Sequence, residues 1–172
     1  MSFLLSLAAA SAASQIVQAV ANPLSNAESG LLQCHRPDIQ KKTCQSIASY
    51  SFTGTAAYDN TAVVPIAENV TLETNTPVVV KEDAVCGFIR AEDTIAGVLR
   101  VNNVEVEPDK ARPVLANIAK AMGQFAGKEI CTRYEDTAGQ LTAKVSINGT
   151  YQPGLDQRVI WVLPSEGYVV TR

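Results

Sequence analysis

The stretch Ser46-Ile47-Ala48-Ser49-Tyr50-Ser51-Phe52 decides the fold class, because its side chains alternate in character. Ala48, Tyr50 and Phe52 would share one face of an extended chain, and the serines between them would share the other. A period of two is typical of a half-buried β-strand. We therefore expect a sheet with one face towards the core and the other towards solvent.

Similar short runs of β-branched and aromatic residues lie on both sides of this stretch. We expect further strands at 31–34, 61–66, 70–74, 78–80, 85–89, 99–101, 104–106, 129–134, 141–147, 158–163 and 168–170. Asn102-Asn103 and Asn148-Gly149 suit tight hairpin turns, because Asn and Gly tolerate a positive φ. Pro65 has no N–H to donate, so it should lie at a sheet edge. Short turns between neighbouring strands indicate an antiparallel sheet.

One segment has the helical period instead. Between residues 109 and 126 the apolar side chains recur at the spacing of one helix face. These positions are Val114, Leu115, Ile118, Met122 and Phe125. Pro113 suits a first helical turn, and Gly127 is a typical stop. The sequence thus predicts an α+β fold, mainly an antiparallel β-sheet packed against one principal α-helix at about residues 109–126.

The N-terminus has the features of an export signal. Residues 3–13 form an uncharged apolar run, too short for the roughly 20 residues that cross a bilayer, and Ala19-Val20-Ala21 supplies an A-x-A cleavage pattern. We interpret residues 1–21 as a signal peptide, residues 22–29 as a flexible leader and residues 30–172 as a single globular domain. The alternative for the first segment is an N-terminal helix of the mature domain. We expect a periplasmic or secreted protein that does not span a membrane after cleavage.

The four cysteines are then expected to form disulfides. Cys34, Cys44, Cys86 and Cys131 allow three pairings. We favour Cys34–Cys44, which closes a polar loop, and Cys86–Cys131, which joins two expected strands. A zinc site is the competing interpretation, but no C-x2-C pair occurs and the only histidine, His35, directly follows Cys34. We expect disulfides and no metal.

The formal net charge of −3 offers no basic field to attract nucleic acid, so we expect no nucleic-acid partner. Catalytic motifs are equally scarce. No G-x-S-x-G sequence occurs, and we interpret His35 as an exposed loop imidazole. Glu92 and Asp93 are the acids that we would test for hydrolysis, although solvated charge is the simpler interpretation. We expect no cofactor, and an enzyme is the less favoured class.

One group of residues is a candidate ligand site. Arg90 and Arg133 follow the two cysteines that we pair, and Arg158 and Tyr134 lie in neighbouring expected strands. Together these side chains would bind a small anion. The alternative is surface ion pairing, such as Arg133 with Glu135. The single tryptophan, Trp161, is expected in the core.

Several phrases resemble small exported proteins of alphaproteobacteria. The phrases are Leu32-Gln33-Cys34, Thr43-Cys44-Gln45-Ser46-Ile47, Val85-Cys86-Gly87, Ile130-Cys131-Thr132-Arg133-Tyr134 and Asp156-Gln157-Arg158-Val159-Ile160-Trp161-Val162. They span most of the mature chain. The resemblance implies a periplasmic address and two disulfides, and it transfers no catalytic residue.

The sequence favours a non-catalytic binding or interaction domain of the bacterial envelope. Its partner would be an envelope protein, a lipid or a small anionic ligand. An inhibitor of an envelope enzyme, with the 34–44 loop as a rigid probe, is a special case of this class. A small envelope hydrolase that uses carboxylates such as Glu92 and Asp93 is the alternative from another class.

Overall fold

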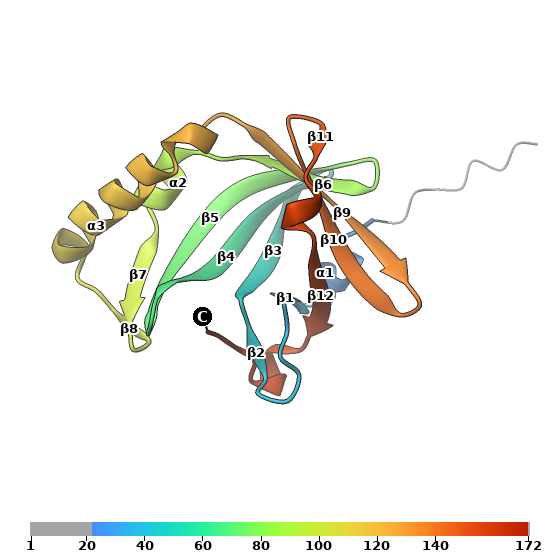
Figure 1. Ribbon diagram of the computed structural model, residues 1–172, viewed down its shortest axis with the longest axis horizontal. Helices are drawn as coiled ribbons and strands as arrows, with labels where there is room; N and C mark the ends of the chain where they lie inside the picture. The colour runs from blue at the N-terminus through green and yellow to red at the C-terminus, as the bar shows by residue number, and fades with distance from the viewer. Residues whose placement is uncertain (1–21, 172) are drawn as a thin grey trace, which may run out of the picture.

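The described chain folds into an antiparallel barrel of eight strands, shown in Figure 1. The computed structural model describes residues 22–171, so the expected signal peptide at 1–21 lies outside the described residues. Around the barrel the strands follow the order β3-β4-β5-β6-β9-β10-β12-β1, and β1 pairs back onto β3. Their bounds are β1 Leu32–His35, β3 Ser46–Gly54, β4 Ala57–Ala67, β5 Val70–Lys81, β6 Ala84–Phe88, β9 Glu129–Thr137, β10 Gln140–Ile147 and β12 Gln157–Val162.

The remaining elements are short, apart from one helix. The helices are α1 Ser25–Glu28, α2 Ala91–Ile95 and α3 Pro108–Ala121, with 3-10 turns η1 Gly123–Phe125, η2 Pro153–Leu155 and η3 Pro164–Glu166. The small strands are β2 Thr43–Cys44, β7 Val98–Val101, β8 Val104–Glu105, β11 Thr150–Tyr151 and β13 Val169–Val170. No helix among the described residues is both long enough and apolar enough to cross a membrane.

Barrel closure shows that the predicted α+β class is wrong. Strands make up 51% of the described residues, and the helix predicted at about 109–126 exists as the shorter α3, which has Pro113 in its interior rather than in its first turn and does not cover an open sheet. The physical reason is strand length: β4 has 11 residues and β5 has 12. Strands this long twist and coil until the sheet meets its own edge. The alternation of side chains is the same in an open sheet and in a barrel, so the sequence pattern did not separate them.

Backbone turns follow the local sequence closely. Asn102 and Asn103 have φ values of 51° and 63° between β7 and β8, and Asn148 and Gly149 have 48° and 77° between β10 and β11. Both predicted hairpin turns are therefore confirmed. Positive φ at consecutive residues matches the twist of the flanking strands.

The prolines of β4 and β5 lie where a strand has only one neighbour. Pro65 pairs with β5 at Thr71, beyond the last residue of β4 that pairs with β3. Pro77 pairs with β4 at Asp59, between the segments of β5 that pair with β7 and with β6. A missing N–H costs no ladder bond at such positions. Pro65 therefore lies at a local edge, as expected. Along other parts of its length, β4 is paired on both sides.

The stretch 22–29, expected to be a flexible leader, carries α1 and a buried leucine. Leu24 is 0% exposed and packs with Ala27 against Tyr58 and Val85. The side chain of Asn22 donates to the hydroxyl of Tyr58 at 2.8 Å. The segment therefore contributes an apolar anchor to one of the cores.

A second core lies between α3 and the part of the wall formed by β5 and β7. Leu72 and Leu99 from these strands pack against Ala111 and Leu115 from α3. Figure 1 shows α3 running beside this part of the sheet, together with α2. The helix covers the inner face of the long strands where they extend past the rest of the barrel.

Both predicted disulfides are confirmed. Cys34–Cys44 and Cys86–Cys131 have Cα–Cα distances of 5.4 and 4.1 Å. Cys34 and Cys44 form a third buried cluster with Val162, on the side of β1 opposite to the barrel interior. The second bridge joins directly paired residues of β6 and β9.

Gly97 lies between α2 and β7, too close to β5 for a side chain. A Cβ at Gly97 would lie 2.8 Å from the backbone oxygen of Glu73 and 2.8 Å from Cδ1 of Leu72. The absence of a side chain therefore lets the turn after α2 rest directly on β5.

We expect Gly97→Ala to lower the free energy of unfolding by about 1–3 kcal/mol, because the methyl group overpacks this contact. Urea titration measures the change. Gly154→Ala is the matched control, since a Cβ there meets nothing within 4 Å, and it should stay within about 0.5 kcal/mol of the wild type. Equal effects of the two variants would contradict the contact.

We expect Leu24→Ala to lower the free energy of unfolding by about 2–5 kcal/mol, because it leaves a cavity under α1. Ser25→Ala, at an exposed neighbouring position, is the control and should change it by less than about 0.5 kcal/mol. A loss for Leu24→Ala no larger than that of the control would mean that residues 22–29 do form a loose leader.

Candidate functional site

The main candidate site is a cavity of about 340 Å³ between the barrel wall, α2 and α3, partly open to solvent. It is lined by alternate residues of the strands, as expected for one face of a pleated sheet. The apolar lining comprises Val64, Ile66, Leu72, Val78, Val85, Phe88, Ile89, Ile118, Met122 and Ile130. The uncharged polar lining comprises Tyr50, Asn60, Thr74, Thr76, Thr94, Thr132 and Tyr134.

A buried glutamine organises one wall of this cavity. Gln33 of β1 is 0% exposed. Its Oε1 accepts hydrogen bonds from the hydroxyls of Tyr50 at 3.0 Å and Tyr134 at 3.1 Å. Nε2 of His35 lies 3.0 Å from the same oxygen, within hydrogen-bond distance. One carbonyl thus joins side chains from β1, β3 and β9.

Burial keeps this cluster uncharged. Burial raises the pKa of Tyr50 and that of Tyr134, so both phenols stay protonated. Burial lowers the pKa of His35 to about 4. Its Nδ1 is shielded and has no hydrogen-bond partner among the described residues, so a proton there would place an unpaired charge inside the protein.

This placement corrects the expectation for His35. We expected an exposed loop imidazole, but His35 is the last residue of β1 and is half-buried. The part of the 34–44 loop that lies outside β1 begins at Arg36. The sequence signal was its spacing from Gln33, because residues two apart in a strand share a face.

The ionic groups at the cavity form a closed pair. Nε and Nη2 of Arg90 donate to the two carboxylate oxygens of Asp93 at 3.0 and 2.6 Å. The hydroxyl of Thr76 donates to the same carboxylate at 2.9 Å. The Asp93 side chain is only 10% exposed, so the bidentate pair is partly desolvated. These contacts fasten α2 to β5 at the cavity.

The four residues of the expected anion site are divided between two faces of the barrel wall. Arg90 and Tyr134 line the cavity. Arg133 instead forms an ion pair with Asp83 at 2.6 Å, and Arg158 is exposed. Adjacent residues of a strand point to opposite faces, so Arg133 and Tyr134 do not act on one ligand. Trp161 packs against the cluster that contains Leu24, consistent with its expected place in the core.

Glu92 and Asp93 do not converge on a common space. Asp93 lines the cavity, whereas Glu92 is absent from its lining and its side chain is 72% exposed. The carboxylate of Asp93 already accepts hydrogen bonds from Arg90 and Thr76. The two carboxylates are therefore not arranged on either side of a bound substrate.

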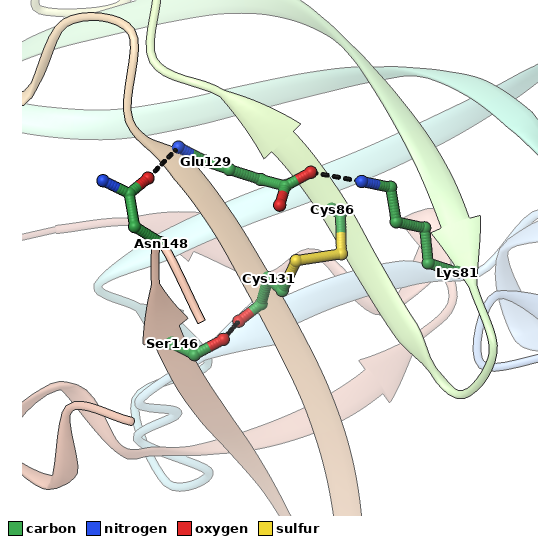
Figure 2. The surroundings of a disulfide bond; sticks show 6 residues. All are labelled: Lys81, Cys86, Glu129, Cys131, Ser146 and Asn148. Atoms are coloured by element: carbon green, nitrogen blue, oxygen red, sulfur yellow. Dashed lines mark hydrogen bonds and ion pairs between the residues drawn. A yellow bond between two sulfur atoms is a disulfide. The ribbon is translucent and has the colours of Figure 1, made fainter. Parts of the chain in front are cut away.

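A second hollow lies on the outer side of β6, β9 and β10, next to the Cys86–Cys131 bridge. Figure 2 shows the bridge beside the ion pair between Lys81 and Glu129. Ser146 donates to the backbone oxygen of Cys131 at 3.4 Å, and Asn148 accepts from the backbone N–H of Glu129 at 2.9 Å. These contacts brace the bridged strands.

The cations around this outer hollow are neutralised. Lys81 pairs with Glu129, Arg133 with Asp83, and Lys144 with Asp156 at 2.7 Å. The only group of potential metal ligands found among residues 22–171 is Cys86, Glu129 and Cys131, and its two sulfur atoms are bonded to each other. The barrel cavity is therefore the stronger candidate site.

Sequence reasoning missed Gln33, although the necessary signal is present in part. Gln33 is a polar residue between the apolar Leu32 and the disulfide-bonded Cys34. The position of Tyr50 on the core face did follow from its alternating stretch. Only barrel closure, which brings β1 between β12 and β3, places the glutamine next to both tyrosines.

Comparison of the chain with protein-family models, with curated proteins and with solved structures finds no match. The two disulfides implied by the resemblance to exported proteins are present. Bridges of this kind are typical of a non-reducing, extracytoplasmic environment. Function has to be inferred from the geometry of the cavity.

We expect His35 to make folding stability depend on pH. Its folded pKa of about 4 lies below the ordinary value of 6.5, so the unfolded chain binds a proton first as the pH falls. This contribution is complete above pH 6.5 and is lost progressively towards pH 4. Between pH 7 and pH 5 the wild type should lose about 2 kcal/mol more than His35→Gln, which cannot titrate.

Urea titrations of both proteins at pH 7, 6 and 5 measure this difference. The carboxylates contribute equally to both proteins, so subtraction isolates the imidazole. Parallel stability profiles for the wild type and His35→Gln would contradict the buried neutral state of His35.

Proposed function

We propose that the protein is a non-catalytic, extracytoplasmic binding protein that holds a small, uncharged, mainly apolar molecule in the barrel cavity. The observation that carries this proposal is the cavity of about 340 Å³ with its largely apolar lining. Ligand cavities are commonly 300–1,000 Å³, with mostly apolar walls and a few placed polar groups. A barrel of eight strands is just wide enough to hold one small ligand.

Charge balance favours an uncharged ligand. Arg90 and Asp93 are the only residues of the lining that carry a charge at neutral pH, and they are paired with each other. An anionic ligand would have to displace Asp93 from the guanidinium group and leave that carboxylate without its partner. Losing one member of a desolvated pair is costly. The anionic ligand expected from the sequence is therefore the less favoured occupant.

The acid–base groups near the cavity favour binding over catalysis. The low pKa of His35, about 4, makes it a weak base at neutral pH. A general base works best with a pKa close to the operating pH. Asp93 has its carboxylate oxygens engaged by Arg90 and Thr76. These properties suit a cavity that holds a molecule without changing it.

The periplasmic or secreted address is part of the proposal. It is supported by the two disulfides and by the apolar run and A-x-A pattern of the first 21 residues.

We expect the wild type to bind the neutral fluorophore N-phenyl-1-naphthylamine, with increased emission and a higher melting temperature. Thr74→Phe should weaken this binding at least about tenfold, because the ring fills the cavity. Asn75→Phe is the matched control: it is the next residue of β5, exposed on the opposite face, and should bind as the wild type does.

Circular dichroism establishes that both variants are folded. The proposal fails if the wild type does not bind the fluorophore, or if Thr74→Phe binds it as tightly as Asn75→Phe does.

A further inference from the structure

Two tyrosine hydroxyl groups at the cavity wall already use their protons in hydrogen bonds within the protein. Tyr50 and Tyr134 line the cavity, and their hydroxyl oxygens lie 3.0 and 3.1 Å from Oε1 of Gln33. A carbonyl oxygen only accepts hydrogen bonds, and the two hydroxyls also hydrogen-bond each other, so both phenol protons are used within this cluster. Each phenol oxygen can therefore accept a hydrogen bond from a ligand but has no further proton to donate.

Several contacts hold the phenols in this state. Nε2 of His35 also lies 3.0 Å from Oε1 of Gln33, so polar groups from three residues surround this oxygen. Gln33 itself is fully buried. Burial also raises the pKa of both tyrosines, so neither becomes a phenolate under physiological conditions. The pair offers a fixed arrangement of neutral acceptors.

We propose that the ligand carries a neutral hydrogen-bond donor, a hydroxyl or an amide N–H, that the hydroxyl oxygens of Tyr50 and Tyr134 accept. This inference rests on the proposed function and names the ligand class for the same cavity. A molecule with an apolar body and one hydroxyl would satisfy both the apolar lining and the phenol oxygens. An ether of the same shape brings no proton, and it would leave these buried acceptors unpaired.

The test compares 4-phenylphenol with 4-methoxybiphenyl as competitors for N-phenyl-1-naphthylamine. The two molecules share the apolar body, and only the phenol donates a hydrogen bond. We expect the wild type to bind the phenol about tenfold more tightly than the ether, the ratio that one net hydrogen bond provides.

Tyrosine variants then locate the preference. In Tyr50→Phe/Tyr134→Phe the phenol should lose its advantage, whereas the affinity for the ether should stay within about threefold of the wild type. Tyr151→Phe is the control, because this exposed tyrosine lies on β11, outside the cavity, and it should keep the preference. If the double variant does not fold, Tyr50→Phe alone should reduce the preference.

Equal binding of phenol and ether by the wild type, or a preference for the ether, would overturn this inference while leaving the proposed function intact. A preference for the phenol that survives in the folded tyrosine variants would also overturn it. Failure of the fluorophore and of both biphenyls to bind would instead refute the proposed function.

Discussion

A four-residue strand, β1, closes the barrel, and the rest of the structure depends on its register. It pairs with β12 on one side and with β3 on the other. The alternation of its side chains sends Gln33 into the barrel and Cys34 outwards to its bridge with Cys44. A shift by one residue would exchange the two faces, turning Cys34 into the barrel and away from Cys44, and Gln33 out of the barrel and away from the tyrosines. The disulfide and the glutamine cluster therefore support the same register from opposite sides.

Neutrality is the main electrostatic property of the cavity, and it arises in two different ways. The phenols and His35 are uncharged because burial opposes their charged forms. Arg90 and Asp93 keep their charges but cancel them through a bidentate pair. Together these effects leave an apolar space in which a few hydrogen-bonding groups have fixed orientations. Such a space discriminates ligands by shape and by hydrogen bonding rather than by net charge.

The helices complete the site but do not define the fold. Helix α3 supplies Ile118 to the cavity, the residue that follows α3 supplies Met122, and α2 supplies Asp93 and Thr94. Asp93 accepts from Thr76 of β5, and Gly97 lets the chain after α2 rest on the same strand. The insertion between β6 and β9 thus covers one part of a wall that the strands have already built.

The sequence by itself determined the local features: the alternating strand at Ser46–Phe52, the turns at Asn102-Asn103 and Asn148-Gly149, and the helix that became α3. These depend on side-chain period and on the φ values that Asn and Gly tolerate, which act over short stretches. The two disulfide pairings were favoured among three possibilities, and one of them joins residues 45 apart in the sequence. Only the tertiary structure decided that the sheet closes, that Gln33 meets Tyr50 and Tyr134, and that Arg90 and Arg133 are separated. These relations come from pairing between strands far apart in the chain, whose partners and curvature are not encoded in any one segment.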